Sequence, residues 1–137
     1  MLDNILLPAI ALMGLSLLVG LIHFLSSSKL IGKDKQWRST IPLEPYEESP
    51  KWLRLQKNNL QNLFEYPVIF YFLIGISYLQ GISTSLLMYT AWAYFLFRFL
   101  HSTFHILMSD GLLRSTPWLL SQIALLILLI EFCLNIL

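Results

Sequence analysis

The sequence predicts an all-α integral membrane protein, a four-helix bundle whose antiparallel helices run up and down across the bilayer. Of its 137 residues, 56% are hydrophobic and only 12% are charged, about half the charged share of a soluble domain. Four long stretches are largely free of charge, and each is near the ~20 residues that one helical crossing needs. So little polar surface excludes soluble enzymes and disordered linkers, and a net charge of +1 leaves no basic surface for nucleic acid.

The four stretches are separated by turn-forming or charged residues. Residues 66–97 contain no charge but are too long for one helix, and the segment 80–85, rich in turn-forming residues, divides them. The first stretch follows Asp3 rather than a basic region, which argues against a cleaved signal peptide. The predicted spans cover residues 4–28, 60–79, 85–107 and 117–137.

The chain reads as a single membrane domain over residues 1–137, with one substantial connection at about 29–57. Most of the basic residues lie in or beside that connection. They are Lys29, Lys33, Lys35, Arg38, Lys51, Arg54 and Lys57. Because basic loops stay in the cytoplasm, we expect this connection and the one that holds Arg114 to be cytoplasmic. Both termini are then on the non-cytoplasmic side.

The start of the fourth span and the lone cysteine are also informative. Thr116 is expected to cap the last helix, with Pro117 at the first helical position. Cys133 has no partner for an intramolecular disulfide and cannot build a cysteine-rich metal site.

Polar residues recur on one face of the second span. Asn58, Asn62 and Glu65 have i, i+4, i+7 spacing, which places them on one stripe of a continuous helix. Pro67 follows closely and cannot donate a backbone hydrogen bond. We therefore expect the helix to bend there and to leave a backbone carbonyl free beside Asn62 and Glu65.

The third span carries a second polar stripe, formed by Tyr94, Arg98, His101 and His105. An arginine near the centre of a membrane helix costs about 2.5–3.5 kcal/mol on the insertion scale. Such residues are found facing the bundle interior, where they form pairs and serve sites. We expect the stripe to face inward, with Arg98 near Glu65.

Simpler roles for these residues stay open. A Glu65–Arg98 ion pair would by itself fix the helix register. His101 would serve equally as a helix–helix hydrogen bond, and His105 as a hydrated interfacial group. A metal site on His101 and His105 is less favoured, because Glu65 is the only obvious third ligand, and we predict no metal.

Two strings in these spans resemble hallmarks of the MAPEG family, the membrane-associated proteins in eicosanoid and glutathione metabolism. Residues 62–67 read Asn-Leu-Phe-Glu-Tyr-Pro, like the family's Asn-x-x-Glu followed by proline. Residues 98–102 read Arg-Phe-Leu-His-Ser, like its Arg-x-x-His-[Ser/Thr], and Arg114 matches the arginine downstream. The resemblance covers the whole chain in topology and residues 58–114 in motif, and it is strongest to the bacterial branch.

The resemblance implies a homotrimer with glutathione as cofactor, bound toward the cytoplasm. It also implies the inner membrane of a bacterium, or the endoplasmic reticulum of a eukaryote. Its motifs give Arg114 and His105 as catalytic residues, His105 standing where the family has a tyrosine. Family enzymes usually have an arginine at the position of Asn58. The cofactor contacts implied are Asn58, Asn62, Glu65, Tyr66, Arg98, His101 and Arg38.

Two functions follow as hypotheses. The first is a membrane glutathione-dependent transferase or peroxidase, in which an arginine stabilises the thiolate and a lipophilic electrophile arrives from the bilayer. The second is a non-catalytic relative that binds a lipid, a thiol or another membrane subunit. Arg114 together with His101 favours the first, and Asn58 in place of arginine favours the second. A transporter fits less well, because the chain has no inverted repeat.

Overall fold

The computed structural model describes residues 4–33, 50–108 and 111–136, and the regular elements in these ranges are α-helices. This confirms the all-α prediction. The helices are α1 (Leu6–Lys33), α3 (Lys51–Asn62), α4 (Pro67–Leu79), α5 (Ser85–Leu107) and α6 (Gly111–Ile136).

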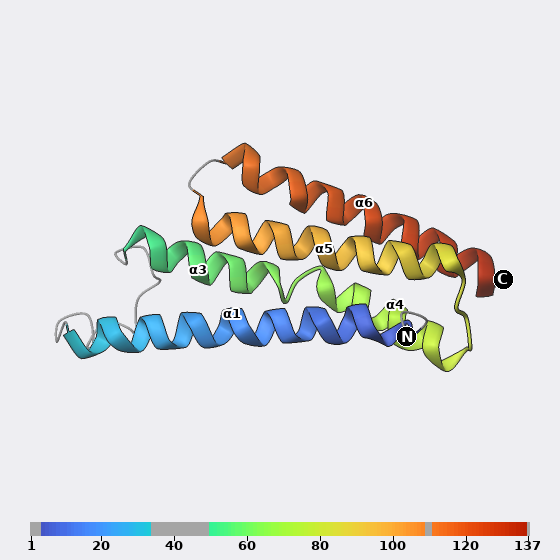
Figure 1. Cartoon of the computed structure of the whole chain (residues 1–137), viewed down its shortest axis with the longest axis horizontal. Coiled ribbons are helices and arrows are strands. Elements are labelled where there is room, and N and C mark those ends of the chain that lie inside the picture. Colours follow the sequence, from blue (N-terminus) through green and yellow to red (C-terminus); the bar gives the residue numbers. More distant parts are fainter. Residues whose placement is uncertain (1–3, 34–49, 109–110, 137) are drawn as a thin grey trace.

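The helices lie side by side in a bundle (Figure 1). We describe the bundle as four paths across the membrane. One path is α1, the next is α3 continued by α4 after a break, and the others are α5 and α6. Successive paths run in opposite directions, so the start of α1 and the end of α6 lie at the same end of the bundle (Figure 1). The helix α5 packs most extensively against α6, and α1 contacts α3, α4 and α5.

Three helical stretches are long and apolar enough to cross a membrane, by length and composition. They are Leu6–Leu30, Lys51–Leu79 and Gly111–Ile136. The fourth path, α5, has 23 residues and is therefore about 35 Å long, enough for a hydrocarbon core of about 30 Å. It is less apolar than the others because it carries the polar stripe, which is buried against its neighbours.

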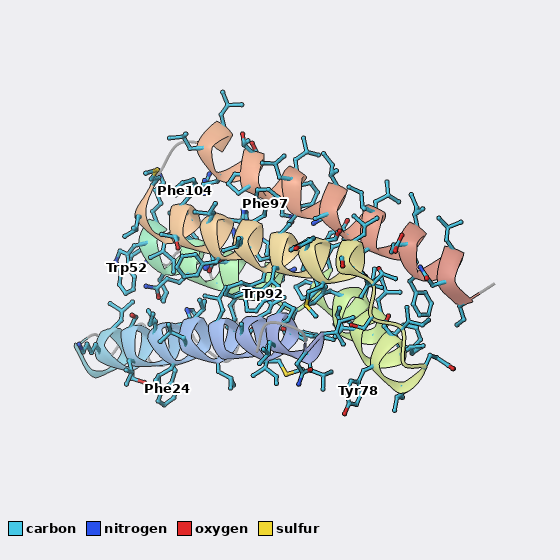
Figure 2. The ribbon with its side chains drawn as sticks, turned by 45° about the vertical axis from the view of Figure 1, so that its right-hand side comes forward. Phe24, Trp52, Tyr78, Trp92, Phe97 and Phe104 are labelled. Atoms are coloured by element: carbon cyan, nitrogen blue, oxygen red, sulfur yellow. The ribbon has the colours of Figure 1, made fainter. Side chains whose placement is uncertain are left out.

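The outer surface of the bundle is apolar, the reverse of a soluble protein. Leu17 is 75% exposed and Phe24 is 65% exposed. Figure 2 shows Phe24 and Tyr78 projecting away from the bundle. Contiguous apolar surface of this extent needs a partner of like polarity, and lipid acyl chains supply it.

The second path breaks where proline was expected to bend it. The helix α3 ends at Asn62, residues 63–66 form turns, and Pro67 is the first residue of α4. Proline has no amide hydrogen for the preceding turn, but it suits the first position of a new helix. The predicted bend is therefore confirmed, as a full interruption of the helix.

The helix boundaries differ from the predicted spans in three places. The helix α1 ends at Lys33, beyond the predicted end at residue 28. The helix α3 begins at Lys51, so the second path starts inside the connection predicted at 29–57. The helix α6 begins at Gly111, so the prediction of an N-cap at Thr116 is wrong. The Thr116 hydroxyl instead donates to the Leu112 carbonyl at 2.9 Å, and Pro117 lies inside the helix. A membrane helix tolerates such a proline where neighbouring groups satisfy the freed backbone.

Candidate functional site

A polar pocket of about 350 Å³ lies between α3, α5 and α6, near the end of the bundle where α3 and α6 begin. Its lining residues come from three helices and are mostly polar. They are Asn58, Asn62, His101, His105, Gly111, Arg114, Ser115 and Trp118. The volume lies at the lower end of the range for small-molecule sites.

The pocket brings together most of the residues that the sequence had singled out. Asn58 and Asn62 lie one turn apart on α3, His101 and His105 lie one turn apart on α5, and Arg114 lies in the first turn of α6. Sequence reasoning missed Ser115 and Trp118. Their positions in the sequence could have indicated both residues. Trp118 is one helical turn after Arg114, and Ser115 directly follows Arg114.

His101 links α5 to the first turn of α6. Its Nδ1 lies 2.8 Å from the backbone carbonyl oxygen of Arg114. Because a carbonyl can only accept, Nδ1 carries the hydrogen and donates. The other ring nitrogen, Nε2, is buried and has no partner. A neutral His101 therefore keeps one nitrogen lone pair that has no hydrogen-bond partner.

His105 stands one turn further along the same face. The two imidazole rings are 5.4 Å apart in an edge-to-face arrangement. His105 is buried, and its Nδ1 has no hydrogen-bond partner. The pocket thus holds two histidine nitrogens that are unpartnered.

Arg98 is fully buried and is held by neutral groups. Its Nε donates to the Tyr94 hydroxyl at 3.2 Å, and its Nη1 donates to the Asn62 carbonyl oxygen at 3.3 Å. The guanidinium carbon lies 5.4 Å from the centre of the Tyr94 ring and 5.9 Å from that of Tyr66. Since Asn62 is the last residue of α3, Arg98 sits at the negative end of that helix dipole. Its Nη2 is buried without a partner.

The predicted inward-facing Glu65–Arg98 pair is wrong. The chain leaves its helix at Asn62, so Glu65 no longer shares a stripe with Asn58 and Asn62. Glu65 is exposed, and its Oε1 accepts a hydrogen bond from Gln61 Nε2 at 3.0 Å. Glu65 lies in the turn between α3 and Pro67, and its carboxylate therefore does not face Arg98.

Two further predicted contacts lie outside the pocket. Tyr66 is 39% exposed, and its ring packs edge-to-face on Trp118 with centroids 5.8 Å apart, so it stands at the rim. Arg38 lies outside the described residues. Across the ranges that the structure does describe, there is no group of three His, Cys, Asp or Glu side chains that could hold a metal ion.

Asn59 is a structural polar residue that sequence reasoning missed. It is fully buried, and its Nδ2 donates to Ser102 Oγ at 2.7 Å, which joins α3 to α5 behind the pocket. Its spacing from Leu63, which is also buried, was the available signal, because i, i+4 residues share a face.

The fold and the pocket together define a class: a helical membrane protein with a polar ligand site at one end of an otherwise apolar bundle. Residues 5–133 match the model of the MAPEG family, nearly the whole chain, and the chain belongs to that family. Its members are membrane proteins of glutathione and eicosanoid metabolism, which generally use glutathione. No curated protein and no solved structure matches the chain.

Proposed function

We propose that this protein is a membrane-bound glutathione-dependent transferase or peroxidase that acts on lipophilic electrophiles. The single observation that supports this most is the pocket, which three helices line. Arg114 of α6 and the two histidines of α5 lie there with the side-chain amides of Asn58 and Asn62 of α3. Family membership supports glutathione as the ligand. The apolar outer surface supports a substrate that arrives through the bilayer.

Glutathione carries two carboxylates, two amides, a thiol and an ammonium group, and the pocket fits most of these. The side-chain amides of Asn58 and Asn62 pair with peptide amides. Ser115 and the first turn of α6 suit a carboxylate, because a helix N-terminus attracts anions. The buried, unpartnered Nη2 of Arg98 is a second donor for a carboxylate, next to Asn62.

The ammonium group has no anionic partner among the described residues that line the pocket. Glu65, three residues after the lining residue Asn62, is exposed and does not line it. In the homotrimer that the family implies, an outward-facing group lies where a second subunit would pack. We therefore propose that the complete site forms between subunits, with Glu65 contributing to it there.

Bound glutathione supplies a nucleophilic sulfur, and the residues of this chain would prepare it. An unperturbed thiol has a pKa near 8.5, and only the thiolate is a good nucleophile. A cation within about 4 Å favours the thiolate by on the order of 4 kcal/mol at an effective dielectric constant of 20. Arg114, which lines the pocket, would act in this way, and the positive end of α6 would add to its effect. We propose that His105, whose Nδ1 has no hydrogen-bond partner, accepts the thiol proton.

The Arg114→Ala variant tests this role directly. We expect wild-type protein mixed with glutathione to show the ultraviolet absorbance of a bound thiolate, and Arg114→Ala to lose it. Arg54→Ala is the matched control, since Arg54 is an exposed arginine of α3 that does not line the pocket. Equal thiolate absorbance in wild type and Arg114→Ala would remove Arg114 from the mechanism.

A non-catalytic relative that binds a lipid, a thiol or another membrane subunit is the second candidate. One observation favours it: the pocket holds Asn58 where family enzymes usually have arginine, and none of the described residues that line it is a carboxylate. In this second case, the protein would bind its ligand without forming a thiolate. Turnover of a lipophilic electrophile or a lipid hydroperoxide with glutathione separates the two candidates, because only the first predicts a glutathione conjugate or, for the hydroperoxide, oxidised glutathione.

A further inference from the structure

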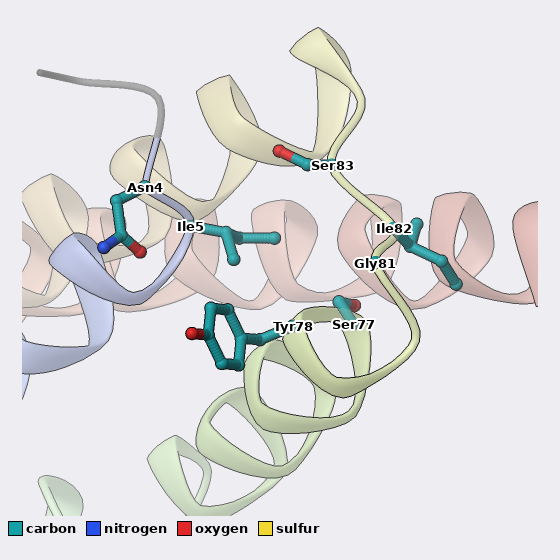
Figure 3. A pocket seen from close by; sticks show the side chains of 7 residues that line it. All are labelled: Asn4, Ile5, Ser77, Tyr78, Gly81, Ile82 and Ser83. Carbon is teal, nitrogen blue, oxygen red and sulfur yellow. The ribbon is translucent and has the colours of Figure 1, made fainter.

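A second cavity, of about 480 Å³, lies at the other end of the bundle from the polar pocket. It is formed where α1 begins, α4 ends and the chain turns into α5 (Figure 3). The described residues that line it are neutral. They are Asn4, Ile5, Ser77, Tyr78, Gly81, Ile82 and Ser83.

Ser77 is the unusual member of this lining. It is 0% exposed, yet its hydroxyl has no hydrogen-bond partner. Other helix hydroxyls in this protein donate to the carbonyl one turn earlier, as Ser16 does to Leu12 at 3.0 Å. Figure 3 shows the Ser77 side chain among Ile5, Tyr78 and Gly81. A buried hydroxyl without a partner beside a cavity is a group that an occupant can satisfy.

The other lining residues define the chemistry of that occupant. None of the described residues among them carries a charge, so these residues offer a charged head group no compensation for lost hydration. Ile5 and Ile82 offer apolar contact, while Asn4, Tyr78 and Ser83 bring polar groups to the same space. This combination suits a neutral polar head on an apolar chain.

The position in the bundle agrees with such a ligand. The cavity lies at the end of α4, where Tyr78 and Leu79 are 55% and 81% exposed on the outer, lipid-facing side. Tyrosine is typical of the boundary between hydrocarbon and water. A head group in the cavity would therefore stay at the membrane interface while its chain lies in the bilayer.

We propose that this cavity binds an uncharged lipid of the monoacylglycerol class. The Ser77 hydroxyl bonds a glycerol hydroxyl or ester oxygen of the head, and Ile5 and Ile82 contact the start of the acyl chain. The site is separate from the polar pocket and does not depend on the function proposed for it.

Photolabelling tests the site on the full-length protein in lipid nanodiscs. The probe is a monoacylglycerol that carries a photoreactive diazirine near the start of its acyl chain, and labelled peptides are mapped by mass spectrometry. We expect labelling around residues 4–5 and 77–83. Unlabelled monoolein should compete with the probe, and oleate, the charged fatty acid, should compete much less.

Two variants and their controls link the labelling to the cavity. Ser77→Ala removes the hydroxyl and should lower labelling about fivefold, the effect of one hydrogen bond. Ser83→Trp should fill the cavity and abolish it. Ser16→Ala, a buried serine whose hydroxyl is satisfied within its helix, and Ser85→Trp, an exposed position outside the cavity, should label like wild type.

Three results would overturn the proposal. One is labelling that is absent from these peptides, as expected if water or a second subunit fills the cavity. Another is equal competition by oleate and monoolein, which would show that charge does not matter. The third is wild-type labelling in both Ser77→Ala and Ser83→Trp.

Discussion

Arg98 shows how a charged residue can be stable in the middle of this bundle. No carboxylate contacts it in the part of the chain that the structure describes, and it donates to a tyrosine hydroxyl and to the carbonyl oxygen of Asn62. That carbonyl is accessible only because α3 ends there, which frees the last carbonyls of the helix. The helix break and the buried arginine are therefore one feature: the break supplies the acceptor, and the arginine holds the broken end beside the pocket.

The hydrogen bond between Asn59 and Ser102 gives a stability prediction at the residue scale. Each single variant, Asn59→Ala and Ser102→Ala, should lower the free energy of unfolding in a detergent titration. The double variant should cost less than the sum of the two. The expected coupling is about 1 kcal/mol, between the average of about 0.6 kcal/mol and the maximum of about 1.7 kcal/mol for such bonds inside membranes. Strict additivity would mean that the bond does not join α3 to α5.

Single residues were predictable from the sequence where helical periodicity held. Tyr94, Arg98, His101 and His105 follow i, i+4, i+7, i+11 spacing on an unbroken helix, and all four are buried. Glu65 was misplaced because the same spacing rule was extended across the break before Pro67. A pattern rule assumes one helix axis, and the turn at residues 63–66 ends that axis.

At the scale of elements, the turn from α4 to α5 is specified by one glycine. Gly81 has a φ of +68°. The Gly81 amide donates to the Tyr78 carbonyl at 3.2 Å, and the Ile82 amide donates to the Ser77 carbonyl at 2.9 Å. This pair of bonds is the Schellman arrangement, which needs a left-handed residue just past the helix. The prediction of a turn at 80–85 is confirmed for this physical reason.

Two glycine variants should change stability in opposite directions. Gly81→Ala forces alanine into the left-handed region and should destabilise the protein by about 1–2 kcal/mol. Gly75→Ala, in the middle of α4 with open space around the added carbon, should stabilise it by up to about 1 kcal/mol through helix propensity. Chemical unfolding of both variants checks the signs. A loss of stability in Gly75→Ala would reveal a close contact at that face.

The contact between α5 and α6 shows what the sequence could not supply. Thr84 caps α5, accepting from the Leu87 amide at 3.1 Å, and its hydroxyl donates to Glu131 Oε1 at 2.7 Å. The capping threonine was readable from local sequence, but its partner is far away in the chain. The predicted start of α6 at residue 117 was wrong for a related reason, since the helix begins at Gly111. Threonine followed by proline is a frequent helix start, and only tertiary packing decides that this helix begins earlier.

For the whole molecule, the orientation in the membrane stays a prediction, and cysteine labelling tests it. With Cys133→Ala as background, a cysteine at Ser83 should react with an impermeant thiol reagent added outside intact cells. A cysteine at Lys51, at the opposite end of the bundle, should react only after the membrane is opened. The positive-inside rule is the reason. The reverse pattern would invert the topology and place the polar pocket on the non-cytoplasmic side.

The oligomeric state is also a question for the whole molecule. The structure of one chain places the pocket between three of its own helices and leaves Glu65 outside it. We propose that Glu65 of a second subunit meets the glutathione ammonium. For the homotrimer that the family implies, native mass spectrometry should show three copies of the 15.9 kDa chain. Glu65→Gln should weaken glutathione binding without changing that mass.

The most direct test of the central claim, that the polar pocket binds glutathione, is calorimetric titration of the purified protein with glutathione. We expect saturable heat with one site per chain in wild type and in the Arg54→Ala control, and much weaker binding in Asn62→Ala, whose side chain lines the pocket. No heat of binding at millimolar glutathione, or unchanged binding in Asn62→Ala, would contradict the assignment of this pocket.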